Sequence, residues 1–268
     1  MMRHDELRNR AIKKTRENIK KELIRRDKLI VYVVKTMDQI DKSANVLVEQ
    51  LREWYAVYFP ELARSVEEPD EYLKLLINLK TKDKFTEAAI VELVGEKRYR
   101  LDLEHASKNS MGIELSEDDM ASIVSYAERV QMLRNERQKL ESYLEKLMKE
   151  ECPNIQAVAG SAIGARLIAT AGSLERLAEF PSSTIQVLGA EKALFSHLKK
   201  HTLCPKHGLI FAYPRLRGSP LKARGKIARK LASKLSIASR VDFFKGEFVG
   251  DKLAKALDDQ INSVVKKR

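Results

Sequence analysis

Apolar residues in the first half of the chain recur at alternating steps of three and four residues. The first series comprises Ile30, Val33, Met37, Ile40, Ala44, Leu47, Leu51, Trp54 and Tyr58. A second series comprises Ile123, Tyr126, Val130, Leu133, Leu140, Leu144 and Leu147, with Arg137 at its polar position. This spacing is typical of the a and d positions of a coiled coil, and it predicts a long antiparallel hairpin. The alternative is that each series is the core face of an ordinary bundle helix.

Helix-ending and helix-starting residues delimit the two series. Pro60 closes the first series and Pro153 closes the second. Ser116 lies three residues before Asp119, which is the spacing of a capping box at a helix start. Between the two series, residues 71–79 and 85–94 are predicted to form short helices. We therefore expect residues 28–150 to form a coiled-coil hairpin with a helical insert.

Glycine is concentrated in the C-terminal third, where nine of the eleven glycines lie from Gly160 onward. Ser173 is predicted to cap a helix that runs to residue 180, and four further helices are predicted at residues 184–188, 190–201, 221–244 and 248–265. Residues 204–218 are predicted to form a structured loop with a short extended piece at 209–213. Only 6% of the residues are aromatic. The sequence thus predicts an all-α protein whose residues 151–268 form a globular helical domain.

The net charge of +12 is confined to the C-terminal part of the chain. Residues 192–268 hold 19 Lys and Arg against 5 Asp and Glu, whereas the rest of the chain holds 31 against 33. On a helix over 221–244, Lys222, Lys226, Arg229 and Lys230 share one face. We predict that eight cations of this region bind phosphate groups, namely Lys192, Lys199, Lys200, Lys206, Arg224, Lys226, Arg229 and Lys230. The alternative is a solvated helix face, but the lack of acidic residues over 222–240 favours a polyanion.

The chain offers few groups that could carry out chemistry. Cys152 and Cys204 are too few for a thiolate metal site, and His197 with His201 lacks a third ligand. No phosphate-binding glycine loop occurs. We therefore expect no catalytic residue, no metal and no cofactor. Apolar runs are far shorter than a bilayer span and the N-terminus is charged, so we expect a cytoplasmic protein without a membrane anchor.

Several strings resemble the Nop-domain family, the archaeal scaffold proteins of box C/D guide ribonucleoproteins. The most specific is Gly189-Ala190-Glu191-Lys192-Ala193-Leu194-Phe195. Others are Pro205-Lys206-His207-Gly208 and Gly225-Lys226-Ile227-Ala228-Arg229, with Leu51-Arg52-Glu53-Trp54-Tyr55 upstream. The resemblance extends from about residue 26 to about residue 250.

The resemblance implies a non-catalytic scaffold. Members of the family form homodimers through a coiled coil, for which the candidate residues here are Ile40, Leu47, Leu51, Val130, Leu133, Leu140 and Leu144. They bind kink-turn guide RNA together with a small ribosomal-type kink-turn protein, and Lys206, Arg224, Lys226 and Arg229 would approach that RNA. They also recruit fibrillarin, which uses S-adenosylmethionine to methylate ribose 2′-hydroxyls of rRNA and tRNA, so that cofactor is expected on the partner.

One departure concerns the N-terminal region. Family members usually carry a mixed α/β domain before the coiled coil, whereas about 26 residues precede the matching text here. Residues 1–27 form a predicted charged helix that could dock fibrillarin together with the hairpin, or the α/β domain could be missing or encoded differently. Two rival functions stay open. One is a DNA-bridging nucleoid-type coiled-coil dimer, and the other is an RNA-modifying enzyme that uses Ser or His.

Overall fold

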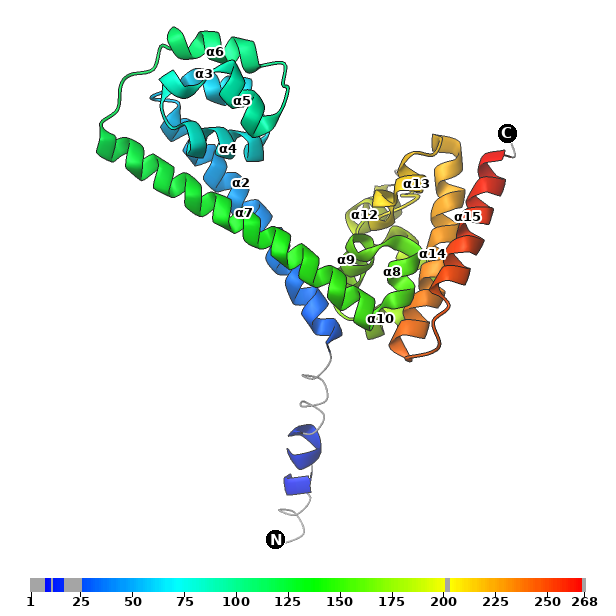
Figure 1. The fold of residues 1–268 in the computed structure, drawn as a ribbon. Coiled ribbons are helices and arrows are strands. Elements are labelled where there is room, and N and C mark those ends of the chain that lie inside the picture. Colours follow the sequence, from blue (N-terminus) through cyan, green and yellow to red (C-terminus); the bar gives the residue numbers. More distant parts are fainter. Residues whose placement is uncertain (1–7, 11, 17–25, 201–202, 267–268) are drawn as a thin grey trace. The chain divides into compact units, whose positions relative to one another are not determined.

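The computed structural model describes residues 8–10, 12–16, 26–200 and 203–266, and this part of the chain is helical without any strand (Figure 1). The all-α prediction is therefore confirmed. The chain divides into two compact units, one formed by residues 37–140 and the other by residues 1–36 with 141–268. The domain boundaries expected near residues 27 and 150 stay predictions.

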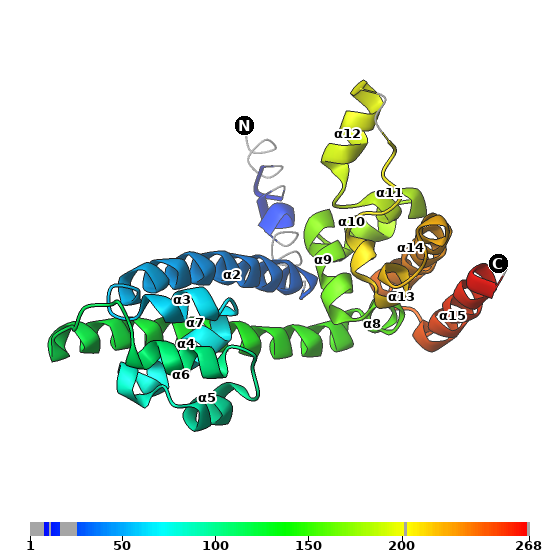
Figure 2. The same ribbon diagram turned by 90° about the horizontal axis from the view of Figure 1, so that it is seen from above.

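Two long helices occupy the positions of the two heptad series. They are α2 (Asp27–Tyr55) and α7 (Glu117–Glu151). Within residues 37–140, Tyr126 donates from Oη to Gln50 at 3.3 Å, and Arg137 donates from Nε to Asp41 at 3.1 Å. Residue numbers fall along α2 as they rise along α7, so the helices run antiparallel there, as their ribbons also show (Figure 2).

The start of α7 confirms the predicted cap at Ser116, although the Asp119 carboxylate accepts from the Ser116 hydroxyl and not from its backbone N–H. Ser116 Oγ accepts a hydrogen bond from the backbone N–H of Asp119 at 3.1 Å and lies 2.5 Å from the Asp119 carboxylate. Glu117 and Asp118 occupy the first turn, where negative charge complements the helix dipole.

Burial divides the first heptad series into two halves. Its members at seven-residue intervals, namely Ile30, Met37, Ala44 and Leu51, are buried. In the other half, Val33 is buried, Ile40 and Leu47 are half-buried, and Trp54 is 45% exposed, so the placement of Trp54 in the seam stays a prediction. The core is instead completed by Val48 and Tyr55, because the insert packs on that side of α2.

The second series divides in the same way. Ile123, Val130 and Leu144 are buried. In the other half, Tyr126 and Leu140 are half-buried and Leu133 is 38% exposed, and only the last member, Leu147, is buried. Each long helix thus has an apolar stripe that its own chain does not fully cover.

The insert between the long helices contains more helices than the sequence predicts. The predicted pair is confirmed as α4 (Pro69–Leu79) and α5 (Glu87–Val94). Three short elements were not predicted, namely α3 (Pro60–Ser65), η1 (Lys82–Lys84) and α6 (Arg100–Lys108). The insert and α2 share one hydrophobic core, which contains the buried rings of Tyr55, Phe59, Tyr72 and Phe85.

Arg52 connects α2 to the start of this insert. Its guanidinium donates to the carbonyls of Ala63, Val66 and Glu67 at 3.2, 2.8 and 2.7 Å, and it lies 4.6 Å from the ring centroid of Tyr72. The backbone after α3 is therefore held by a charged donor from α2.

The second unit is built around α14 (Leu221–Phe243). The other elements after α7 are α8 (Pro153–Ala159), α9 (Ser161–Ala171), α10 (Leu174–Glu179), α11 (Ser182–Val187), α12 (Glu191–Lys200), η2 (Leu209–Ala212), α13 (Pro214–Arg217) and α15 (Gly250–Lys266). Helix α14 buries Ile227, Leu231 and Leu235 and packs against α8, α10, α11 and α15. The predicted cap is confirmed, since Ser173 Oγ accepts from the N–H of Arg176 at 3.1 Å.

The predicted extended piece at residues 209–213 is wrong. This segment is a 3-10 helix in which Phe211 donates its N–H to Gly208 and Tyr213 donates to Ile210, both at 3.0 Å. Ile210 alone is buried there, so the apolar run does not mark two faces of a strand.

Two buried carboxylates bind the N-terminal amides of short helices. Asp242 on α14 accepts from the backbone N–H of Asn154 at 3.0 Å, from its Nδ2 at 2.7 Å and from the N–H of Ile155 at 2.9 Å. Asp27 accepts from the N–H of Leu174 at 3.0 Å. Burial raises the pKa of Asp242, and the three N–H donors act in the opposite direction. These contacts fix α8 and α10.

Asp242 provides a test of this anchoring. Asp242→Ala leaves three N–H groups without their acceptor, so we expect the free energy of unfolding to fall by about 3 kcal/mol or more. Asp242→Asn keeps one acceptor oxygen and should lose roughly half as much. Urea unfolding followed by circular dichroism measures both variants. An unchanged midpoint for Asp242→Ala would contradict the anchoring role.

Candidate nucleic-acid interface

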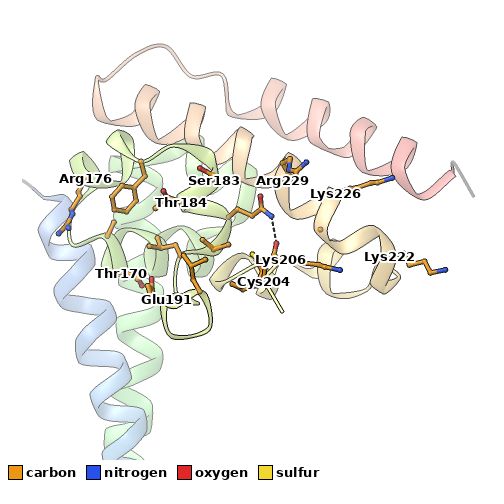
Figure 3. Close-up of a pocket in the computed structure, with 18 residues that line it drawn as sticks. Thr170, Arg176, Ser183, Thr184, Glu191, Cys204, Lys206, Lys222, Lys226 and Arg229 are labelled. Atoms are coloured by element: carbon orange, nitrogen blue, oxygen red, sulfur yellow. Dashed lines mark hydrogen bonds between the residues drawn. The ribbon is translucent and has the colours of Figure 1, made fainter. Parts of the chain in front are cut away.

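A cavity of about 1050 Å³ opens in the second unit beside α14 (Figure 3). Its lining comes from the end of α9, from α10, α11 and α12, from the segment around Pro205 and from the first turns of α14. Apolar side chains such as Val187, Leu188 and Leu194 form part of the lining. The cavity is thus assembled from the strings that resemble the Nop domain.

One wall of the cavity is cationic. We define this cationic wall by Lys206, Lys222, Lys226 and Arg229, all of which are exposed. Three of the four project from the same face of α14, since they are three or four residues apart. Figure 3 shows this wall on the α14 side of the cavity, whereas Arg176 and Thr170 lie on the opposite side.

The four cations are not neutralised within the described part of the chain. No ion pair or hydrogen bond among the described residues involves their side-chain nitrogens, although ion pairs are plentiful elsewhere, as between Arg26 and Glu150 at 2.8 Å. Glu191, the one carboxylate in the lining, accepts instead from the N–H of Gly189 at 2.7 Å. Exposed and uncompensated cations on one wall are suited to the phosphates of a polyanion.

The turn that carries Lys206 is held against the end of α11. Gln186 donates from Nε2 to the carbonyl of Lys206 at 2.7 Å. In return, Gly208 donates its N–H to Gln186 at 2.9 Å and Leu209 donates to Leu188 at 2.8 Å. The position of Lys206 is therefore set by backbone hydrogen bonds, which its charge alone does not reveal.

Two glycines make this close approach possible. A Cβ at Gly208 would lie 2.0 Å from the carbonyl oxygen of Leu188. Gly189 has a φ of 86°, and a Cβ there would lie 2.5 Å from Cγ of Leu209. Only glycine suits either position without displacement of the backbone.

The remaining predicted cations lie outside the cavity lining. Lys192, Lys199 and Lys200 are exposed on α12, and Lys230 is exposed on α14. Helix α12 has no buried residue, and its apolar side chains Phe195 and Leu198 are 60% and 63% exposed. Helix α12 thus presents exposed apolar and cationic side chains together.

Arg224 differs from the other predicted cations. Its Nε donates to the carbonyl of Ser219 at 2.9 Å and its Nη2 donates to that of Arg217 at 3.1 Å. It also lies 5.3 Å from the ring centroid of Phe211, which stacks on His207 with centroids 4.4 Å apart. Burial and the charge of Arg224 lower the pKa of His207. This stack could not be predicted from the sequence, because its members are separated by up to 17 residues.

The described residues contain no group of three or more His, Cys, Asp or Glu side chains that could hold a metal ion. His201 lies outside the described residues, so the prediction that His197 and His201 lack a third metal ligand stays untested. Among the helices that the structure describes, none combines the length and apolar character that crossing a bilayer requires.

The family model and the relatives that match this chain agree on the family that it is similar to. A family model described as "Nop: snoRNA binding domain, fibrillarin" matches residues 36–267. An uncharacterised NOP5 family protein of Methanocaldococcus jannaschii is 45% identical over 253 residues, and nucleolar protein 56 of Homo sapiens is 37% identical over 254 residues. These alignments cover 94% and 92% of this chain but 61% and 43% of the relatives, so the chain spans only part of their length.

A solved structure is also similar. It is a crystal structure of a fibrillarin/Nop5p complex, in which the matching chain is 26% identical with a TM-score of 0.55. The match covers 97% of this chain and 78% of that chain.

Gly208 and Gly225 provide a matched pair for testing the turn. Gly208→Ala places a Cβ against the carbonyl of Leu188, and we expect a loss of roughly 2 kcal/mol in the free energy of unfolding. Gly225→Ala lies in α14 with its nearest neighbour, Cδ of Lys206, at 3.5 Å, so it should be neutral or stabilising by about 0.5 kcal/mol. Thermal unfolding measures both. Equal effects of the two substitutions would contradict the close approach at Gly208.

Proposed function

Because the chain belongs to the Nop family, we propose that it is an RNA-binding scaffold subunit of a box C/D ribonucleoprotein that guides 2′-O-ribose methylation. The observation that carries this proposal is the cationic wall formed by Lys206, Lys222, Lys226 and Arg229. Its four exposed charges meet no carboxylate within the described residues, so phosphate groups can satisfy them.

The neighbourhood of the cationic wall supports a composite ligand. Exposed apolar side chains on α12, chiefly Phe195 and Leu198, suit a protein surface rather than a phosphate backbone. Lys192 lies on the same helix and can reach a polyanion beside that protein. We propose that the wall contacts kink-turn guide RNA while α12 contacts the small ribosomal-type protein bound to that RNA.

Fibrillarin is the proposed enzymatic partner. The similar crystal structure is of a complex between Nop5p and fibrillarin, and the matching family model carries fibrillarin in its description. We infer that this chain contributes positioning, while the methyltransferase supplies S-adenosylmethionine and the chemistry. Docking of fibrillarin on residues 1–27 and the hairpin stays a proposal, and residues 1–7, 11 and 17–25 lie outside the described part.

Salt dependence tests the RNA-binding wall. Lys226→Gln combined with Arg229→Gln should lower affinity for kink-turn RNA carrying its kink-turn protein by roughly tenfold or more, and should reduce the slope of log affinity against log salt by about two. Lys252→Gln combined with Lys255→Gln on α15 removes the same charge from two other exposed positions and should leave the slope unchanged. Gel-shift titration at several salt concentrations gives both quantities.

The same titration separates the proposal from its main rival. Binding should require both the RNA kink and the kink-turn protein. Equal affinity for any duplex, without that protein, would contradict the composite surface and would favour the DNA-bridging coiled-coil dimer.

We further propose that the chain forms a homodimer through the apolar stripes left half-exposed on α2 and α7. Trp54 lies against Tyr126 with ring centroids 6.1 Å apart. Because both stripes repeat every seven residues in antiparallel helices, Leu47 falls opposite Leu133 and Ile40 opposite Leu140. The half-exposed residues therefore form a continuous strip suited to a second copy.

The two halves of the heptad pattern predict different outcomes of substitution. Leu47→Glu combined with Leu133→Glu should give monomers with unchanged helix content, since both side chains are partly exposed. Leu51→Glu or Val130→Glu places a charge in the core and should unfold residues 37–140. Sedimentation equilibrium and circular dichroism distinguish the outcomes. A folded dimer for the Leu47 and Leu133 double variant would contradict the proposed strip.

A further inference from the structure

Arg224, Phe211 and His207 form a layered stack that joins α14 to the turn carrying Lys206. The Arg224 guanidinium lies 5.3 Å from the centroid of the Phe211 ring. The same ring stacks on the ring of His207, with centroids 4.4 Å apart and an interplanar angle of 12°. His207 directly follows Lys206, so the stack connects the first turn of α14 to one member of the cationic wall.

The donors of Arg224 are directed at the protein itself. Its Nε and Nη2 reach the carbonyls of Ser219 and Arg217 at 2.9 and 3.1 Å, which are backbone groups of the segment that leads into α14. Two directed hydrogen bonds and a stacked face require the planar guanidinium fork, which an ammonium group does not provide. Arg229 lies on the same helix and is exposed without any such bond within the described residues.

The Lys206 side chain lies close to the same turn of α14. A Cβ built at Gly225 would be 3.5 Å from Cδ of Lys206, so the aliphatic part of that lysine lies near the backbone next to Arg224. Displacement of the His207 ring would therefore move a cation that faces the cavity.

We propose that Arg224 is a positioning residue, which holds the Lys206 turn on α14 through Phe211 and His207 and does not itself bind phosphate. This inference rests on the proposed RNA-binding function of the cationic wall. It changes the role predicted for Arg224 from a contact of the RNA backbone to a clamp within the protein.

A charge-conserving pair of variants tests the proposal. Arg224→Lys keeps the positive charge but loses the fork and the stack, so affinity for kink-turn RNA with its kink-turn protein should fall roughly tenfold, as for Lys206→Gln. Combining Arg224→Lys with Lys206→Gln should be no weaker than either alone, because both act through the same contact. Arg129→Lys, a matched control at an exposed position of α7 outside the cavity lining, should bind within about twofold of the wild type. Wild-type affinity for Arg224→Lys, or additive losses in the double variant, would overturn the proposal.

The titration of His207 supplies a readout that needs no RNA. In the free protein, nuclear magnetic resonance should find its pKa below the usual value near about 6.5. Arg224→Lys should raise that pKa because the ring becomes more solvated, whereas Arg129→Lys should not change it. An unchanged His207 titration in a folded Arg224→Lys variant would overturn the clamp. Failure of the wild type to bind RNA would instead overturn the proposed function and leave the His207 result to decide the clamp.

Discussion

Helix α14 has an apolar face and an opposite cationic face. The second unit depends on keeping the first face in the core and the second at the surface. One face buries Ile227, Leu231 and Leu235 against four other helices, and the opposite face carries Lys222, Lys226 and Arg229, which meet no counter-charge among the residues that the structure describes. Like charges on neighbouring turns repel each other, so the cationic face lowers the stability of the isolated helix. The buried face offsets this cost through packing. The proposed binding surface therefore depends on the core beneath it.

Buried polar contacts fix the elements around that helix. Asp242 holds the start of α8 and Asp27 holds the start of α10, each by accepting from backbone N–H groups. At the cavity, Gln186 and Gly208 form hydrogen bonds that hold the Lys206 turn against the end of α11. These contacts have directions and short distances, which apolar packing does not impose. Apolar packing forms the core of this unit, and a few hydrogen bonds set the positions of the segments that line the cavity.

Much of this architecture could be predicted from residue spacing. The long helices, the caps at Ser116 and Ser173 and the cationic face of α14 follow from periodicity and local chemistry, which a sequence displays directly. The short helices α3 and α6 were not predicted, because they are too short to show a period of their own and neither has a side-chain cap like that of Ser173 at α10. The exposure of Trp54 could not be predicted either, since it depends on which side of α2 the insert covers. Arg224 shows the same limit at the site, because its charge is visible in the sequence but the carbonyls that accept its hydrogen bonds are not.

The division of each heptad pattern into a covered and an uncovered stripe has a consequence for the order of folding and assembly. The covered stripe, with Leu51 and Val130, completes a core inside one chain, and that core does not need a second copy. The chain can therefore reach its helical structure at any concentration, in contrast to obligate dimers whose subunits are unstable alone. The proposed pairing of two copies would then be a separate step, set by protein concentration and by competing partners rather than by folding.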